Sequence, residues 1–274
     1  MKQERTEYAP APEKTVNYAT ILVNDNGSIR TITLNRPERR NAMTPEMQAE
    51  LIAAMRDAAE CDSRVLVLTG AGSSFCAGLD LAALQAMQTM PASEYTADAE
   101  RIALLFRTLY DLPIPTIAAV QGPAIAGGTG LAMLCDITLA TPEAKFGFTE
   151  VRIGFIPALV SIYLTLQVGE KRSRDLLLTG RLFDAAEAHR MGLVNQIVEP
   201  DQLNQRIKSL ADQLIANSPQ SLRSTKRLLA SQNSDWLDAA ISRAIEASAQ
   251  ARESEDFREG IAAFLEKRKP QWSK

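Results

Sequence analysis

Residues 65–80 read VLVLTGAGSSFCAGLD and residues 116–130 read TIAAVQGPAIAGGTG, and these two stretches decide the fold class. Each begins with a short apolar run of the kind found in buried strands, and each continues into a glycine-containing loop. A helical pattern follows each loop directly. Strands that alternate with helices in this way predict an α/β fold with parallel strands and crossover helices.

The chain before these stretches predicts a hairpin and then a helix. YATILVN (18–24) and SIRTITLN (28–35) are rich in strand-forming residues, and a turn-forming NDNG sequence joins them. Thr44, Pro45 and Glu46 are the residue types of an N-cap and a first helical turn. Further elements are predicted as helices at 79–90 and 97–109 and as a strand at 136–140.

The chain after Pro200 predicts helices. Ser218-Pro219 and Ser254-Glu255-Asp256 are typical helix starts. The last predicted helix carries an apolar stripe made of Phe257, Ile261, Phe264 and Leu265. We therefore expect this helix to be buried against its own core or against a neighbouring subunit.

The composition is typical of a soluble globular protein. The 274 residues are 46% hydrophobic and 23% charged, and the formal net charge of −3 offers no positive field for nucleic acid. Three unpatterned cysteines predict reduced thiols in a cytoplasm. No apolar run approaches the roughly 18 residues of a membrane span. Residues 1–17 predict a flexible lead rather than a signal peptide.

The two glycine loops are candidates for a ligand site. Ligands of parallel α/β folds lie beyond the carboxyl ends of strands, where helix N-termini present free N–H groups. Two such ends that face each other can direct two backbone N–H groups at one oxygen, as an oxyanion hole requires. A dinucleotide site is excluded because Phe75 stands where the third glycine of its fingerprint is required.

Several motifs carry a resemblance to a known family. FCAGLD (75–80) resembles F-x-A-G-x-D, and AGGTGLAMLCD (126–136) resembles G-G-G-x-x-L-x-x-x-C-D. Similar stretches follow the same order and spacing at 35–42, 144–157, 185–194 and 218–226. From about residue 18 to its end, the chain is identified as a member of the enoyl-CoA hydratase/isomerase (crotonase) family.

The resemblance implies a fold and a set of site residues. It implies a spiral of ββα units over 18–199 and a C-terminal helical region over 200–274 that forms a homotrimer, often doubled to a hexamer. Carried over by position, the resemblance implies an oxyanion hole from the N–H groups of Leu79 and Gly127 and an acid–base role for Glu150. Gly130 stands at the position of a second glutamate. The residues implied to contact coenzyme A are Arg39, Ala77, Asp80, Leu81, Phe264 and Lys267. No separate cofactor or metal is implied, because coenzyme A is part of the acyl-CoA substrate.

The single matched carboxylate leaves the reaction open. A hydratase that acts through an oxyanion-stabilised enolate is placed first, and an isomerase or hydratase-lyase with one glutamate is the alternative. A CoA-thioester-binding protein without turnover is the alternative from another class. Acyl chain length and branching are not fixed by any motif.

The glycine at position 130 has two interpretations. Either it leaves a gap that admits a branched or bulky acyl group, or it marks chemistry that needs no second carboxylate. A glutamate introduced there is expected to restore a water-holding group, unless an acid such as Glu94 or Asp98 already does this work. Cysteine–histidine catalysis would have to use Cys76 and His189, the one histidine, and no residue is apparent that would orient them.

Overall fold

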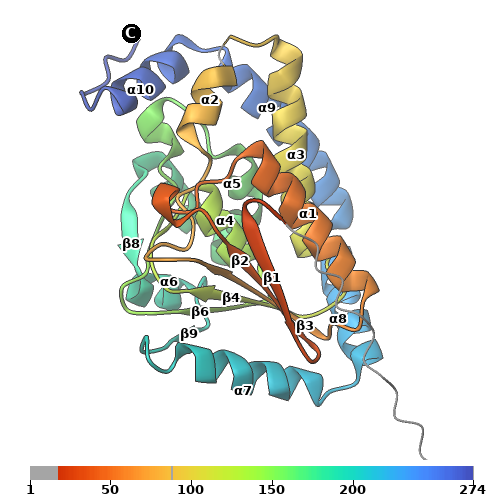
Figure 1. Cartoon of the computed structure of the whole chain (residues 1–274). Helices are drawn as coiled ribbons and strands as arrows, with labels where there is room; N and C mark the ends of the chain where they lie inside the picture. Colours follow the sequence, from red (N-terminus) through yellow and green to blue (C-terminus); the bar gives the residue numbers. More distant parts are fainter. Residues whose placement is uncertain (1–17, 88, 274) are drawn as a thin grey trace, which may run out of the picture.

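The computed structural model describes residues 18–87 and 89–273, so the predicted N-terminal lead lies outside the described residues (Figure 1). The strands are β1 (Ile21–Asn26), β2 (Ile29–Leu34), β3 (Val65–Gly70), β4 (Thr116–Val120), β5 (Ala124–Ile125), β6 (Ile137–Ala140), β7 (Lys145–Gly147), β8 (Leu182–Asp184) and β9 (Gln196–Ile197). The helices are α1 (Pro45–Glu60), α2 (Leu81–Met87), α3 (Ala92–Tyr110), α4 (Gly127–Leu134), α5 (Ala158–Thr179), α6 (Ala185–Met191), α7 (Leu203–Ile215), α8 (Pro219–Ser231), α9 (Ser234–Arg252) and α10 (Glu255–Leu265), with 3-10 turns η1 (Pro37–Arg39) and η2 (Glu150–Ile153).

The strands form two sheets. The larger has the order β1-β2-β3-β4-β6-β9, in which β1 and β2 form the predicted antiparallel hairpin and the later neighbours are parallel. The smaller has the order β5-β7-β8, and each of its strands is two or three residues long. Units such as β4-β5-α4 give one strand to each sheet before the next helix. This repeated alternation confirms the expected crotonase-type spiral of ββα units.

Local chemistry explains the helix that follows the hairpin. The Thr44 side chain accepts a hydrogen bond from the Met47 amide at 3.2 Å, and Pro45 occupies the first turn of α1, where its missing N–H costs nothing. The helix buries Met47, Leu51 and Met55 on one face. The N-cap and the apolar spacing predicted from the sequence are therefore confirmed.

Two apolar cores lie on opposite faces of the larger sheet. One core joins inward side chains of the sheet, such as Ile32 and Leu68, to helices α1, α3, α4, α5 and α9. The other packs Val67 and Ile117 against Leu210 of α7, which runs along the opposite face of the sheet (Figure 1). Alternate strand residues thus face alternate cores, as the two-residue period of a strand requires.

The last two helices return to the middle of the chain. α9 packs against α3 and α5, and α10 packs against η2 and α2 (Figure 1). Phe257 and Ile261 of α10 are buried with Phe155, whereas Phe264 and Leu265 are exposed. The predicted apolar stripe is therefore divided, with one half in the protein's own core. No helix of the described residues is both long and apolar enough to cross a membrane.

Candidate active site

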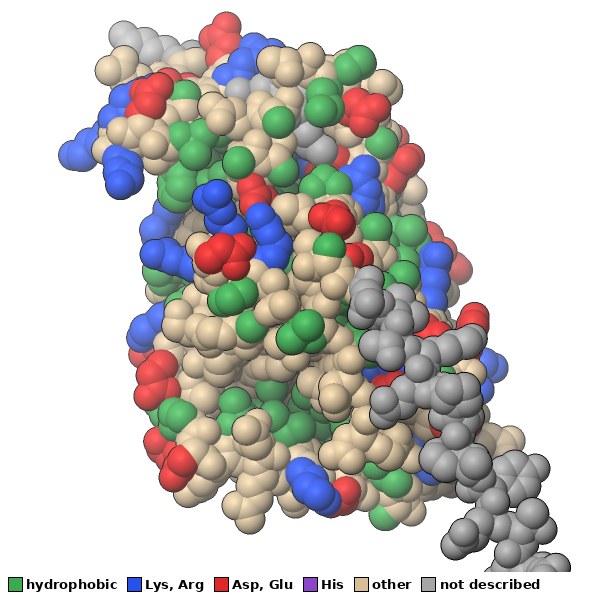
Figure 2. All heavy atoms as spheres, in the orientation of Figure 1, with side chains coloured by type: hydrophobic (Ala, Val, Ile, Leu, Met, Phe, Trp, Pro, Cys, Tyr) green, Lys and Arg blue, Asp and Glu red, His purple; other side chains and the backbone are tan. Residues whose placement is uncertain are grey.

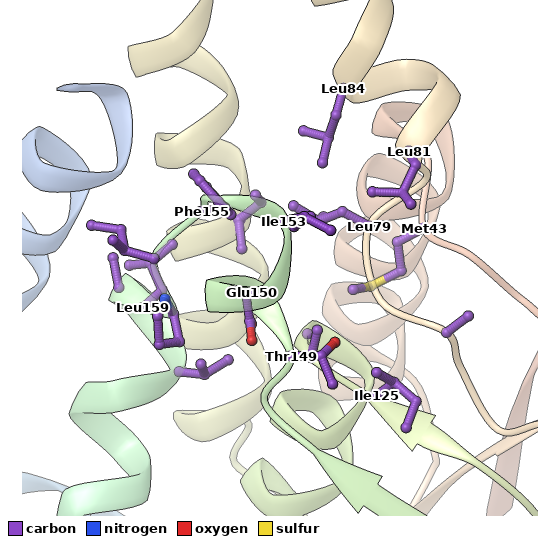
Figure 3. Close-up of a pocket in the computed structure, with 18 of the residues that line it drawn as sticks. Met43, Leu79, Leu81, Leu84, Ile125, Thr149, Glu150, Ile153, Phe155 and Leu159 are labelled. Atoms are coloured by element: carbon purple, nitrogen blue, oxygen red, sulfur yellow. The ribbon is translucent and has the colours of Figure 1, made fainter. Parts of the chain in front are cut away.

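A pocket of about 270 Å³ opens where the loop at 71–80, the β5–α4 junction and η2 meet (Figure 3). Its wall is mostly apolar and includes Met43, Leu84, Phe106, Phe155 and Leu159. Among the described residues, Glu150 is the one acidic side chain that lines it. An apolar cavity with few polar groups is typical of a small-molecule site.

Leu79 brings the first backbone N–H group to the pocket. The Met43 amide donates to the Gly78 carbonyl at 2.8 Å, and the Asp80 amide donates to the Met43 carbonyl at 2.9 Å. Successive amides of an extended segment point to opposite sides, so the Leu79 amide points away from Met43. A Cβ atom on Gly78 would lie 2.9 Å from the Ile125 carbonyl oxygen and 3.6 Å from the Gly127 nitrogen. A glycine at 78 therefore lets the two loops approach closely.

Gly127 brings the second N–H group to the pocket. It is the first residue of α4, and the first amides of a helix have no partner within the helix. Within the described part of the chain, neither the Leu79 nor the Gly127 amide has a backbone hydrogen-bond acceptor. Both residues line the pocket. The two loops singled out in the sequence thus place two unpaired donors beside one cavity.

Glu150 begins η2, three residues after β7 ends at Gly147. Its side chain lines the pocket beside that of Thr149 (Figure 3). Glu150 is only 9% exposed, and its Oε2 atom has no hydrogen-bond partner among the described residues. Burial raises the pKa of the Glu150 carboxyl to about 7, because an apolar environment disfavours the charged form. A carboxyl with such a pKa can both accept and donate a proton near neutral pH.

A family model described as enoyl-CoA hydratase/isomerase matches residues 24–274. The chain belongs to the enoyl-CoA hydratase/isomerase family. Relatives of the chain in this family are named for catalytic activities. The chain is therefore an enzyme of the family and not a binding protein without turnover.

Two relatives illustrate the range of names in the enoyl-CoA hydratase/isomerase family. A Thermus thermophilus protein named "Putative enoyl-CoA hydratase" is 45% identical over 249 residues, which cover 90% of this chain and 98% of the relative. The 1,2-epoxyphenylacetyl-CoA isomerase of Escherichia coli is 36% identical over 256 residues, with 92% and 98% covered. The crystal structure of an enoyl-CoA hydratase from Mycobacterium avium subsp. paratuberculosis superimposes with a TM-score of 0.84 at 26% identity, covering 94% of this chain and 100% of the other.

Position 130 does not contain the gap that the sequence suggested. Gly130 is buried in the first turns of α4 and does not line the pocket. A Cβ atom on Gly130 would lie 2.9 Å from Phe106 Cζ and 2.9 Å from Val160 Cγ1. The interpretation that glycine admits a bulky acyl group is therefore wrong, because side chains of α3 and α5 already fill the space.

The two fallback acids are not placed to replace a second glutamate. Asp98 is 2% exposed and accepts hydrogen bonds from Arg252 at 2.6 Å and from Arg101 at 2.9 Å. Its carboxylate is thus held by two guanidinium groups, and it does not line the pocket. Glu94 is exposed on α3 and also lies outside the pocket. Neither acid can activate a water beside Glu150 in this structure.

The residues that the resemblance assigned to coenzyme A are divided by the structure. Ala77, Leu81 and Phe264 line the pocket. Phe264 does so from α10 of the same chain. Because α10 packs against η2 and carries Phe264, this helix forms part of the wall of its own pocket.

The other three assigned residues lie outside the pocket. Arg39 is exposed on η1, and the neighbouring Arg40 lines the pocket instead. The Asp80 carboxylate accepts from the Arg36 guanidinium at 3.0 Å and caps the first turn of α2. Lys267 is exposed just beyond the end of α10. Only Arg40 therefore presents a cationic side chain to the cavity among the described residues.

Sequence reasoning missed the residue that holds the first loop in shape. Asn41 is completely buried, and its Nδ2 group donates to the carbonyls of Ala71 at 2.9 Å and Ser74 at 2.8 Å. Its Oδ1 atom accepts from the Arg36 amide at 2.9 Å. An asparagine inside one of the six matched motifs was the available signal. It links the turn at 35–42 to the loop that carries Leu79.

Cysteine–histidine catalysis has no geometric basis in the described structure. Cys76 is fully buried, and burial raises the pKa of its thiol to about 12. The Nδ1 atom of His189 lies 2.8 Å from the Val194 carbonyl oxygen at the end of α6. Neither side chain lines the pocket, so the thiol is a structural apolar group.

Proposed function

We propose that this enzyme transfers a proton to or from the α-carbon of an acyl-CoA thioester, and that the reaction passes through a stabilised enolate. The N–H groups of Leu79 and Gly127 hold the thioester oxygen, and Glu150 is the acid–base group. One observation carries the proposal: the buried Glu150 carboxyl, whose Oε2 atom has no hydrogen-bond partner among the described residues, shares an apolar cavity with two amides that lack backbone acceptors. Donors aimed at a developing oxyanion contribute about 10²–10³ in rate each.

Hydration of a 2-enoyl-CoA is the first candidate reaction. In this reaction Glu150 takes a proton from a water whose oxygen attacks C3, and it returns a proton to C2. Thr149 also lines the pocket, and its hydroxyl makes no capping hydrogen bond, so it is available as a second ligand for that water. The Thermus relative, which is named as a putative enoyl-CoA hydratase, supports placing hydration first.

Migration of a carbon–carbon double bond is the second candidate, and a specific observation favours it. Phe106 and Val160 fill the space beside Gly130, so the pocket holds one carboxyl group among the described residues. A single base that removes a proton from one carbon and returns it to another suffices for this reaction. The isomerase named among the relatives is consistent with it.

The surface around the pocket supports an anionic, partly apolar ligand such as an acyl-CoA. In the space-filling view, hydrophobic side chains gather beside α10, and Lys and Arg side chains border them (Figure 2). Arg40 extends this positive character into the pocket. We assign coenzyme A contacts to Arg40 and Phe264, because both line the cavity, and we expect no separate cofactor.

We also propose that the helices after residue 200 assemble the enzyme as a homotrimer or hexamer. α8 buries none of its residues, and Leu228 and Leu229 are 63% and 57% exposed on it. An amphipathic helix whose apolar side chains lie in solvent is stabilised by packing against another subunit. Light scattering of the purified enzyme measures this directly.

Two substrates separate the candidate reactions. Crotonyl-CoA loses its enoyl absorbance on hydration, whereas a 3-enoyl-CoA gains that absorbance on migration of its double bond. Exchange of the α-protons of butyryl-CoA in D₂O reports enolate formation regardless of the reaction that follows. Glu150-dependent exchange is expected. Absence of exchange together with inertness toward both enoyl substrates would overturn the proposal.

A further inference from the structure

One hydroxyl group lies between the two halves of the proposed site. Thr129 is the third residue of α4, two residues after Gly127, and it is 1% exposed. Its Oγ1 atom lies 2.6 Å from the Ala124 carbonyl oxygen, 3.1 Å from the Gly147 carbonyl oxygen and 3.2 Å from the Gly147 amide nitrogen. The side chain thus contacts β5 and β7 from the helix that begins at the oxyanion position.

The donor and acceptor roles follow from the chemistry of a hydroxyl group, which has one proton and two lone pairs. The shorter distance assigns the proton to the Ala124 carbonyl, and the oxygen accepts from the Gly147 amide. The Gly147 carbonyl already accepts from the Ala126 amide at 2.7 Å. All of these groups are buried, so none of them can exchange its partner for water.

The backbone at this junction depends on such contacts. Ala126 has φ 54° and ψ −121°, a region that a residue with a Cβ atom adopts only when its surroundings hold it there. Ala126 is the N-cap of α4, so its conformation sets the direction of the Gly127 amide. On the other side, Gly147 ends β7 three residues before Glu150.

We infer that Thr129 is a positioning residue whose hydroxyl holds the Gly127 amide and Glu150 at a constant separation. This inference rests on the roles proposed above for Gly127 and Glu150. Thr129 does not line the pocket, so it acts through α4 and β7 and not on the substrate. Small displacements at a reacting centre cost about 10²-fold in rate, which makes this separation consequential.

Three variants test the inference. Thr129→Val keeps the shape of the side chain and removes the hydroxyl, and Thr129→Ser keeps the hydroxyl. Thr138→Val is the matched control, because Thr138 is 2% exposed and its hydroxyl donates to the Ala132 carbonyl at 2.8 Å away from the pocket. The readouts are kcat and KM with the preferred enoyl-CoA, α-proton exchange of butyryl-CoA in D₂O, and thermal unfolding.

We expect Thr129→Val to lower kcat and the exchange rate by about 10- to 100-fold with KM changed less than about threefold. Thr129→Ser is expected to recover most of that loss, and Thr138→Val to lower the unfolding temperature without the loss in kcat. If Thr129→Val does not fold, Thr129→Ala replaces it, because alanine adds no apolar volume beside the unpaired amide. A wild-type kcat in Thr129→Val or Thr129→Ala would overturn the inference. A loss of kcat in Thr138→Val as large as that in Thr129→Val would also overturn it.

The proposed function is tested separately in the same assays. Exchange by the wild type that Glu150→Gln abolishes supports the proposed roles, whatever the Thr129 variants do. Exchange that is unaffected by Glu150→Gln refutes those roles and the inference with them. A wild type that depends on Glu150 but not on the Thr129 hydroxyl refutes the inference alone.

Discussion

The ring of Phe106 occupies the space beside Gly130, so that a Cβ atom on the glycine would lie 2.9 Å from the Phe106 Cζ atom. Val160 closes the same space from α5 at an equal distance. Phe106 and Val160 also line the pocket, whereas Gly130 does not. At Gly130, the position that the resemblance assigned to a second glutamate, the side chains of Phe106 and Val160 therefore form an apolar wall.

Replacing Glu150 by glutamine tests its role as the acid–base group. We expect turnover to fall by roughly 10²–10⁴, because the amide cannot transfer a proton, while the fold and the affinity for a CoA thioester are retained. Glu94→Gln is the control, since this exposed glutamate lies outside the pocket. Steady-state kinetics and thioester binding measure both effects. Turnover near that of the wild type in Glu150→Gln would remove the proposed mechanism.

The pH dependence should report the raised pKa of Glu150. As a base the carboxyl must be ionised, so kcat/KM is expected to fall as the pH decreases through about 7 rather than through the ordinary value of 4.5. Stability should respond in the opposite direction. A buried acid with a raised pKa lowers the unfolding free energy as the pH rises from about 4.5 through 7, because ionisation is disfavoured in the folded state.

Two measurements check this prediction. One is kcat/KM between pH 5 and 9, and the other is the free energy of unfolding by urea between pH 4.5 and 7. In Glu150→Gln the stability change between pH 4.5 and 7 should be reduced. A wild-type activity profile that is flat from pH 5 to pH 9 would contradict the prediction.

Gly130→Glu should reduce stability and give no gain in hydration, contrary to the expectation from sequence. The new side chain would meet Phe106 and Val160, and overpacking together with a buried unpaired carboxyl costs about 3 kcal/mol or more. Gly130→Ala is the control for the first side-chain atom alone. Urea unfolding and the crotonyl-CoA assay measure the two outcomes.

The double variant Gly130→Glu with Phe106→Ala is the sharper comparison. Removing the ring opens the space for the glutamate, so hydration relative to isomerisation should rise in the double variant only. Increased hydration by the single variant Gly130→Glu would show that the apolar wall yields easily. It would then restore the interpretation that this site lacks only a water-holding group.

Ile261→Ala should show that α10 belongs to the core of its own chain. Ile261 is fully buried with Phe155, and an Ile→Ala change in a core costs about 2–5 kcal/mol. Leu265→Ala on the same helix should change the unfolding free energy by less than about 0.5 kcal/mol unless another subunit covers it, because Leu265 is 41% exposed in this chain. Denaturant unfolding, with light scattering for assembly, measures both. Equally small changes in unfolding free energy for Ile261→Ala and Leu265→Ala would show that α10 does not pack in this position in solution.

Deleting the chain from Ser254 onward extends this test. The sequence alone predicts smaller, less stable assemblies after the deletion, since an apolar stripe needs a burying partner. The structure adds that the Phe155 side of the pocket loses its cover, because α10 packs on η2. We therefore expect activity to fall even where the assembly is unchanged.

The sequence by itself determined the elements whose signals are local. Alternating apolar residues and turn chemistry specified the hairpin of β1 and β2, and an N-cap with a first-turn proline specified α1. Runs of buried-type residues specified β3 and β4. The signals for these strands and this helix depend on neighbours within a few residues. The family resemblance further assigned Leu79, Gly127 and Glu150 to the site, and the structure brings these three residues to one pocket.

Only the tertiary structure decided what surrounds those residues. The two- and three-residue strands β5, β7 and β8 are too short to have a period in the sequence, yet they carry Gly127 and Glu150 to the cavity. The filling of the space at Gly130 by Phe106, 24 positions away, leaves no trace in local pattern. The extent to which Glu150 is buried, which raises the pKa of its carboxyl, is set by the folded chain. Packing and desolvation are set by residues that meet in space, so they follow from the fold and not from spacing along the chain.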